Sequence, residues 1–260
     1  MKHSKYPYIK KVVKAGINLL LTGEAGTGKT TIAKQLAADL KIPFSSLSMT
    51  KQTSMNAIIG FISINGKYIP SQFRKAFEEG HLFLLDEIDA ADPNVLLILN
   101  TIENGYIAFP DGIVEAHKDF RLVATSNPQG AHQMYTGRSK LDFSTLDRYF
   151  TVELPRDPKL ELNLTSQKVV DVVEFGRQLL KDQGSSIQIT MRDAMRIHEL
   201  TVNEIDEDPI QSVVFAKDST LLKIYHQKVE QFKAEAAEAK KTQHDTDTIE
   251  ELWQKIQEGK

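Results

Sequence analysis

The sequence predicts an α/β fold in which a mostly parallel five-stranded sheet lies between two layers of helices and is followed by a small all-helical domain. Short apolar runs alternate with amphipathic segments over residues 17–154, which is typical of a parallel sheet with helical connections. After Pro155 the strand signals nearly vanish, and two long segments with helical spacing follow. We therefore expect an α/β core at residues 1–156, a helical domain at 157–225 and a charged helical tail at 226–260.

Each element carries its own local signal. Short apolar runs predict five buried strands, at residues 17–22, 43–49, 81–86, 120–126 and 149–154. Helical spacing of apolar residues predicts helices at residues 29–40, 71–79, 93–104, 166–182 and 190–203, and a last apolar stripe predicts a terminal helix at 249–256. Two turn pairs predict hairpins: Asn65–Gly66 within residues 58–70, and Asp111–Gly112 within residues 105–118.

The composition excludes several kinds of chemistry. The 260 residues include 32 Lys and Arg against 35 Asp and Glu, a net charge of −3, which argues against a general polyanion-binding surface. The chain has no cysteine, so disulfides, thiol nucleophiles and Cys-ligated metal centres are excluded. The basic N-terminus lacks the apolar segment of a secretory signal, and no apolar run is long enough to span a bilayer. We expect a soluble cytoplasmic protein with no membrane partner.

The strongest motif is GEAGTGKT, between the first apolar run and the first amphipathic segment. It satisfies G-x-x-x-x-G-K-[ST], in which glycines let backbone N–H groups converge on a phosphate and the following helix adds its positive end. Lys29 can reach the β- and γ-phosphates, and the Thr30 hydroxyl suits Mg²⁺. The predicted nucleotide-binding residues are Gly23, Glu24, Ala25, Gly26, Thr27, Gly28, Lys29, Thr30 and Thr31.

Two successive acidic residues stand at the end of the apolar run at 81–86. Asp86 at its end can hold Mg²⁺ across from Thr30, and Glu87 can polarise an attacking water. Taken alone, acidic residues at a strand end are as readily solvated or helix-capping; the phosphate loop favours the catalytic interpretation. We expect Asp92 to cap the next helix and Asp89 to lie on the surface.

With these motifs in place, the chain resembles an AAA+ ATPase of the MoxR and cobaltochelatase CobS-like, dynein-related branch, which includes phage and bacterial members. The resemblance is carried by GEAGTGKT, by YIPSQFRKAFEEGHLFLLDEIDAADPNVL, by NTIENGYIAFPDGIVEAHKDFRLVATSNP and by TGRSKLDFSTLDRYFTVELP. It covers residues 15–155 well and the helical domain more loosely. It implies a three-layer P-loop NTPase core with a helical lid, and hydrolysis of ATP to ADP with Mg²⁺ held at Thr30 and Asp86.

The resemblance also implies roles for single residues. Asn127 matches the sensor-1 position, where an amide orients the lytic water; its alternative is an Asn-Pro turn. Arg148 matches the arginine finger, which acts on the ATP of a neighbouring subunit; its alternative is a surface ion pair with Asp147 or Asp142. Three further arginines are less specific: Arg138 is a second intersubunit candidate or a surface residue, and Arg192 resembles the sensor-2 arginine, with Arg196 one turn away.

A trans-acting finger implies a homo-oligomer, expected to be a hexameric ring that acts as a chaperone-like remodelling motor. Relatives commonly work with a von Willebrand-like protein, and this chain lacks that partner's D-x-S-x-S motif, so another chain would supply it. The two hairpins would face the pore, and their Phe61, Tyr68, Ile107 and Phe109 either contact a partner or pack on the core. Two alternatives stay open: a nucleotide-gated assembly module, and a DNA-handling protein. Nucleic acid is not indicated as a partner. The N-terminal lysines could form a basic patch for nucleic acid, but such a run is usually a solvated face; they are Lys2, Lys5, Lys10, Lys11 and Lys14.

Overall fold

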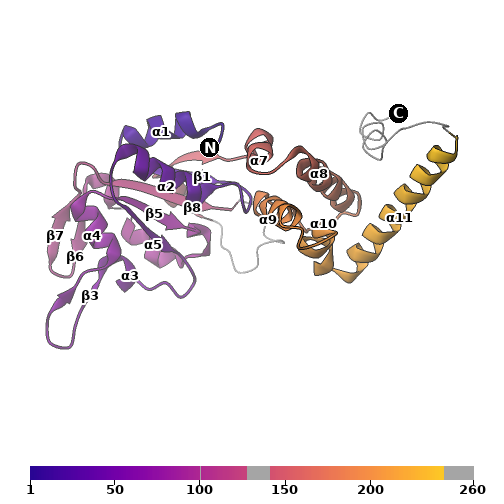
Figure 1. The fold of residues 1–260 in the computed structure, drawn as a ribbon. Helices are drawn as coiled ribbons and strands as arrows, with labels where there is room; N and C mark the ends of the chain where they lie inside the picture. Colours follow the sequence, from indigo (N-terminus) through magenta and orange to yellow (C-terminus); the bar gives the residue numbers. More distant parts are fainter. Residues whose placement is uncertain (100, 128–140, 243–260) are drawn as a thin grey trace. The chain divides into compact units, whose positions relative to one another are not determined.

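The computed structural model describes residues 1–99, 101–127 and 141–242 (Figure 1). The chain divides into two compact units, Met1–Leu164 and Thr165–Lys260, and each is described by itself. Within the described residues, no helix combines the length and the apolar composition that crossing a membrane requires.

The first unit is built on one parallel sheet of five strands, in the order β2-β5-β8-β1-β9. All five predicted strands are confirmed: β1 Leu19–Thr22, β2 Phe44–Ser48, β5 Leu82–Asp86, β8 Arg121–Ser126 and β9 Phe150–Glu153. The order places β8 between β5 and β1, so the ends of these three strands are neighbours at one edge of the sheet. The structure therefore confirms the predicted α/β fold.

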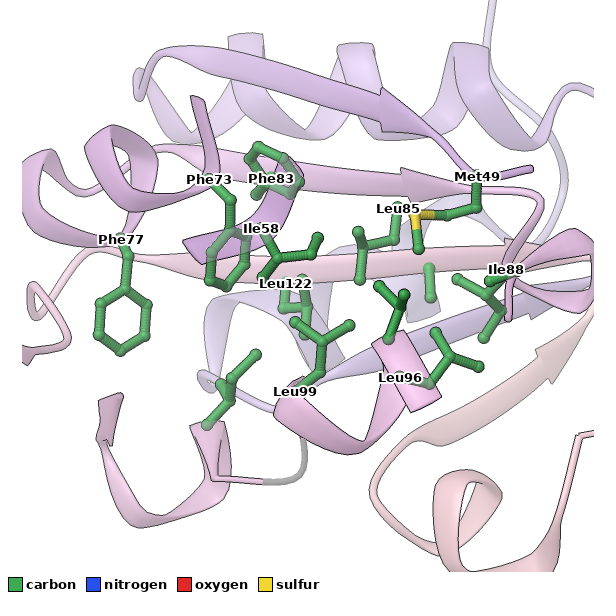
Figure 2. Close-up of a cluster of buried hydrophobic side chains, with 14 of the residues drawn as sticks. Met49, Ile58, Phe73, Phe77, Phe83, Leu85, Ile88, Leu96, Leu99 and Leu122 are labelled. Atoms are coloured by element: carbon green, nitrogen blue, oxygen red, sulfur yellow. The ribbon is translucent and has the colours of Figure 1, made fainter. Parts of the chain in front are cut away.

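Alternate strand residues point to opposite faces, which gives the sheet a helical layer on each side. Leu19 and Leu21 pack with α1 (Tyr6–Lys14) and α2 (Lys29–Leu40) in one apolar cluster. Leu20 joins a second cluster with residues of α3 (Asn56–Ile59), α4 (Gln72–Glu79) and α5 (Pro93–Leu99), part of which is drawn in Figure 2. Three layers follow from this alternation.

Helix α1 is an element that the sequence interpretation missed. Its buried residues, among them Ile9 and Val13, lie on one face, and its lysines lie on the other. Lys2 and Lys10 both pair with Asp39 of α2, at 2.6 and 2.9 Å. Part of the predicted basic patch is thus neutralised by a residue distant in the sequence, which favours the solvated-face interpretation over nucleic-acid binding.

Both predicted hairpins are present. Strands β3 (Phe61–Ile62) and β4 (Tyr68–Ile69) flank Asn65–Gly66, and β6 (Tyr106–Phe109) pairs with β7 (Gly112–Glu115). Because Phe109 pairs with Gly112, the second turn is Pro110–Asp111, one residue earlier than predicted. Of the four side chains considered for partner contact, Phe61 is exposed, Tyr68 is half-buried, and Ile107 and Phe109 are buried in the core.

The first unit extends beyond the predicted boundary at residue 156. It includes α7 (Pro158–Leu164), because the backbone N–H of Ser4 donates to Asp157 at 2.7 Å and the ring of His3 bonds the Pro155 carbonyl at 3.0 Å. Burial opposes ionisation of Asp157, but the hydrogen bonds from the Ser4 and Leu160 amides outweigh it and hold its pKa below the ordinary value. The N-terminal residues therefore bind this segment to the core.

The second unit is helical and has its own apolar core. Its elements are α8 (Gln167–Asp182), α9 (Met191–Val202), α10 (Pro209–Val213), a 3₁₀ turn at Phe215–Lys217 and α11 (Ser219–Thr242). Helix α11 runs through the predicted boundary at 225/226, because Tyr225 and Phe232 pack on Phe215 and Phe175. The predicted terminal helix at 249–256 lies outside the described residues.

Candidate active site

The phosphate loop connects β1 to α2, as the motif predicts. Gly26 and Gly28 have φ of 80° and 90°, in the left-handed region that glycine adopts without a steric cost. A Cβ at Gly23 would lie 2.5 Å from the Leu154 carbonyl oxygen, so the loop packs directly on the chain after β9. Lys29 Nζ donates to the carbonyls of Gly23 and Glu24, at 2.5 and 2.9 Å. The loop holds its own lysine at its centre.

Helix α2 begins directly after this loop. Gly28 precedes its first turn, and within the described residues no side chain caps the N–H groups of that turn and none of its residues is acidic. The first N–H groups of a helix have no acceptor within the helix, and its dipole is positive at this end, so the position favours an anion. Loop and helix together have the features that favour binding of a phosphate group.

A chain of hydrogen bonds joins this loop to the acidic pair after β5. The Thr30 hydroxyl donates to Asp86 Oδ2 at 3.0 Å, and the Thr125 hydroxyl donates to Asp86 Oδ1. The backbone N–H of Glu87 donates in turn to Thr125 Oγ1 at 2.9 Å. Glu87 has left-handed backbone angles, φ 61° and ψ 47°, and its side chain is exposed. Asp86 is thus fixed at both oxygens, while the Glu87 side chain faces solvent.

Asn127 lies at the same edge. It follows β8, whose residues Val123 to Ser126 pair in parallel with Leu19 to Thr22 of β1. The carboxyl ends of β5, β8 and β1 are therefore adjacent, and Asn127 follows the strand between the acidic pair and the phosphate loop. Its side chain is 7% exposed. The topology brings Lys29, Thr30, Asp86, Glu87 and Asn127 to one edge of the sheet.

The donor set suits Mg²⁺. This ion prefers oxygen ligands and usually binds one or two protein groups together with substrate phosphates. The Thr30 hydroxyl and the Asp86 carboxylate meet at 3.0 Å beside the loop, as such a site requires. No group of three His, Asp or Glu side chains that could hold a metal alone occurs in the described part of the chain, so a cation here would need the phosphates as ligands.

Arg148 is not at this edge. Strand β9 runs parallel to β1 with Phe150 opposite Leu19 and Glu153 opposite Thr22. Arg148 precedes β9, whereas the phosphate loop follows β1, so the two lie at opposite ends of the paired strands. Arg148 caps α6 (Phe143–Asp147): its guanidinium donates to the Ser144 carbonyl and lies 3.9 Å from Glu103. The alternative considered for Arg148 was a surface ion pair with Asp147 or Asp142; the ion pair seen is with Glu103 instead.

The amino end of α6 is also fixed. The backbone N–H of Thr145 donates to Asp142 at 2.6 Å, and this bond holds the pKa of Asp142 below its ordinary value. A helix of five residues is thereby anchored at both ends, with Arg148 at its carboxyl end. The arginine has a defined place on the surface of the first unit.

Three other predictions have different outcomes. Asp89 is 7% exposed, so the expectation of a surface position is wrong; it lies in the 3₁₀ turn Ile88–Ala90, between β5 and α5 in the sequence. Arg192 and Arg196 are exposed on α9 of the second unit, and the choice between them stays a prediction. Arg138 lies outside the described residues.

The sequence interpretation missed Thr125. It lies within the predicted strand at residues 120–126 and was assigned no role, yet it links Asp86 to Glu87. A polar residue inside an otherwise apolar strand was the signal that could have drawn attention to it. Its two partners, however, lie 38 and 39 residues earlier, at and just after the end of β5, which no local pattern reveals.

A model of the AAA domain, dynein-related subfamily, matches residues 18–149. These 132 residues are just over half of the 260. The chain belongs to the dynein-related AAA family. It therefore carries an AAA ATPase domain, a domain that binds and hydrolyses ATP, and the predicted family resemblance is confirmed.

Several known proteins are similar to this chain in sequence. An uncharacterized Staphylococcus saprophyticus protein is 30% identical over 225 residues, which cover 77% of this chain and 84% of that protein. The uncharacterized protein YojN of Bacillus subtilis is 26% identical over 151 residues, 54% of this chain and 48% of the relative. Mouse von Willebrand factor A domain-containing protein 8 is 30% identical over 180 residues, 61% of this chain but 9% of the mouse protein. The chain thus spans about half the Bacillus protein.

Solved structures agree on the fold. NtrX from Brucella abortus superposes with a TM-score of 0.51 at 17% identity, over 75% of this chain and 48% of that one. A predicted ATPase from Cytophaga hutchinsonii gives a TM-score of 0.50 at 19% identity, over 76% and 58%. At these identities the likeness concerns the fold alone.

Proposed function

We propose that this chain is the ATPase subunit of a MoxR/CobS-like ring, a hexamer that couples Mg²⁺-dependent ATP hydrolysis to the remodelling of a protein partner. The observation that carries the proposal is the hydrogen-bonded set of Thr30, Asp86, Thr125 and Glu87 beside the phosphate loop. Such an arrangement separates two tasks. One carboxylate is held for a cation, and the other is left directed to solvent, where a lytic water arrives.

The residues divide the reaction among them. The loop N–H groups and Lys29 bind the phosphates, and Thr30 with Asp86 would hold Mg²⁺, which neutralises charge on the β- and γ-phosphates. The carboxylate of Glu87 accepts a proton from the attacking water, and the oxygen of that water bonds to the γ-phosphorus. The bond from that phosphorus to the β–γ bridging oxygen breaks, and ADP and phosphate result. Asn127 orients the water from the neighbouring strand end.

A neighbouring subunit would complete the site. Arg148 lies at the far end of the strands from its own phosphate loop, with a guanidinium suited to the charge that develops in phosphoryl transfer. Phe143, 91% exposed, and Phe150, 41% exposed, flank this arginine and provide apolar surface for a second copy. We infer a head-to-tail contact between copies, which closes into a ring when the rotation permits.

The partner is expected to meet the hairpin β3–β4. Phe61, Ile62 and Ile64 are all exposed there, and a group of exposed apolar side chains is typical of an interaction site. The mouse relative is named for a von Willebrand factor A domain, and this chain matches a small part of it. A separate protein with such a domain is therefore the partner we propose.

The direct test replaces Glu87 with glutamine. The variant should bind ATP with unchanged affinity but hydrolyse it at least about 100-fold more slowly, because general-base catalysis contributes about 10²–10⁴. Glu79→Gln is a matched control: this exposed carboxylate of α4 pairs with His81, away from the loop, and its loss should leave turnover unchanged. Turnover per subunit should also rise with protein concentration. Normal turnover by Glu87→Gln would refute the assigned role.

A further inference from the structure

Thr125 occupies a central position in the site without reaching the nucleotide-binding loop itself. It is fully buried in β8, and its single hydroxyl serves two partners: it donates to Asp86 Oδ1 at the end of β5 and accepts from the backbone N–H of Glu87, the next residue. A hydroxyl has one hydrogen to donate and lone pairs to accept, so both bonds form at once. The Asp86 carboxylate and the Glu87 backbone are thereby both hydrogen-bonded to the same atom, Thr125 Oγ1.

The bond from the Glu87 N–H to Thr125 coincides with an unusual backbone conformation at Glu87. A non-glycine residue with φ of 61° adopts a sparsely populated conformation, which persists only where the surroundings stabilise it. The N–H of Glu87 is directed to Thr125 Oγ1 at 2.9 Å in that conformation. This bond therefore favours the turn that directs the Glu87 side chain to solvent and away from the strand.

We infer that Thr125 is a positioning residue for ATP hydrolysis: its hydroxyl sets the geometry of both Asp86 and Glu87 relative to the phosphate loop. The inference rests on the proposed function, because it assigns Thr125 to the same reaction. Loss of the hydroxyl would leave the Glu87 N–H and Asp86 Oδ1 without this partner inside the protein. The Thr30 bond to Asp86 Oδ2 and the loop contacts of Lys29 would remain, so nucleotide binding should survive.

The chain offers a close series of variants. Thr125→Val keeps the branched shape and removes the hydroxyl, whereas Thr125→Ser keeps the hydroxyl and removes a methyl group. Ser126→Ala is the matched control, because Ser126 is the next residue of the same strand, is 2% exposed, and its hydroxyl has no hydrogen-bond partner in the described residues. All three changes are made in the full chain.

For Thr125→Val we expect kcat for ATP to fall about 10- to 100-fold while the KM for ATP and the affinity for a fluorescent ADP analogue stay within about threefold. Hydrogen–deuterium exchange of the Glu87 amide should accelerate at least about tenfold, since that amide loses its acceptor. Thr125→Ser should restore kcat to within about threefold of the wild type. Ser126→Ala should match the wild type in both measurements.

The outcomes separate the inference from the proposed function. If the wild type hydrolyses ATP and Thr125→Val does so equally well, the positioning role is wrong and the proposed function stands. A purely structural role would lower the melting temperature of Thr125→Val without lowering kcat in the folded protein, and this result would also overturn the inference. If the wild type itself lacks turnover, the proposed function fails; unchanged exchange at Glu87 in Thr125→Val would then refute the hydrogen-bond role independently.

Discussion

Mixing two inactive variants tests whether Arg148 acts on a neighbouring subunit. Arg148→Ala retains its own phosphate loop and Glu87 but offers its neighbour no guanidinium. Glu87→Gln retains Arg148 but has no base of its own. If the finger acts in trans, a mixed ring contains sites in which an intact Glu87 is completed by an intact Arg148, and activity returns.

The structure sets the size of the effect. From the level of Phe150 to the phosphate loop there are four residue steps along β1, about 13 Å at 3.3 Å per residue, and Arg148 precedes Phe150. An arginine in that place does not reach its own γ-phosphate. Each variant alone should therefore lose at least about 100-fold, given about 10²–10⁴ for a general base and about 10³–10⁵ for an arginine finger.

The recovery follows from the statistics of assembly. In an equal random mixture with head-to-tail contacts, half of the sites carry Glu87 and half of their neighbours carry Arg148, so about one quarter of the sites are complete. Phosphate release is measured at fixed total protein, and differently tagged subunits are co-purified to show that mixed rings form. A chain that carries both substitutions is the negative control. Co-assembly without recovery would refute the trans-acting role.

Three further changes probe the loop and the frame that supports the site. Gly23→Ala should weaken ATP binding at least about tenfold in a fluorescent-nucleotide titration. The reason is that the new Cβ would lie 2.5 Å from the Leu154 carbonyl oxygen and would displace the loop. Unchanged binding would contradict this close packing. Arg74→Met should lower the free energy of unfolding, measured in urea, by about 2 kcal/mol. Arg74, with 8% of its side chain exposed, pairs with the half-exposed carboxylates of Glu78 and Asp111 and stacks on Phe109. A loss below about 0.5 kcal/mol would show that these contacts are weak. Asp157→Asn should flatten the acid dependence of stability: because the folded pKa lies below the ordinary value, ionised Asp157 stabilises the fold above about pH 4, and this contribution is lost as the pH falls further. Equal slopes for wild type and variant in acid unfolding would exclude that role.

Local patterns were sufficient for much of the fold. The five strands are short apolar runs, and helices such as α2 and α9 show helical spacing of apolar residues. Helix α9 also has a complete capping box at Thr190. Helix α1 was missed, because its lysines dominate the composition and its apolar face becomes evident only against α2 and the sheet. The helix predicted at 93–104 ends at Leu99, and a separate 3₁₀ turn follows at Ile102–Asn104.

The residues of the candidate site also fall into two groups: those predicted from local motifs and those that depend on tertiary contacts. The phosphate loop and the pair Asp86–Glu87 were found because each is a contiguous motif next to a strand. The burial of Asp89 and the two hydrogen bonds of Thr125 were not predicted, because both depend on contacts between segments that are distant in the sequence. The proposed roles of Arg148 and Asn127 rest on the family resemblance, and the strand register adds only which end of the sheet each one occupies.

The sequence by itself determined the class of fold, the family and the chemistry of the loop, because apolar periodicity and a glycine-rich motif are properties of neighbouring residues. Only the tertiary structure decided how two carboxylates in succession come to have different surroundings. Pairing β8 beside β5 puts one threonine hydroxyl between Asp86 and the Glu87 amide, and the parallel register puts Arg148 at the far end from its own loop. Both results depend on contacts between segments dozens of residues apart, where hydrogen-bond geometry and strand order decide the outcome.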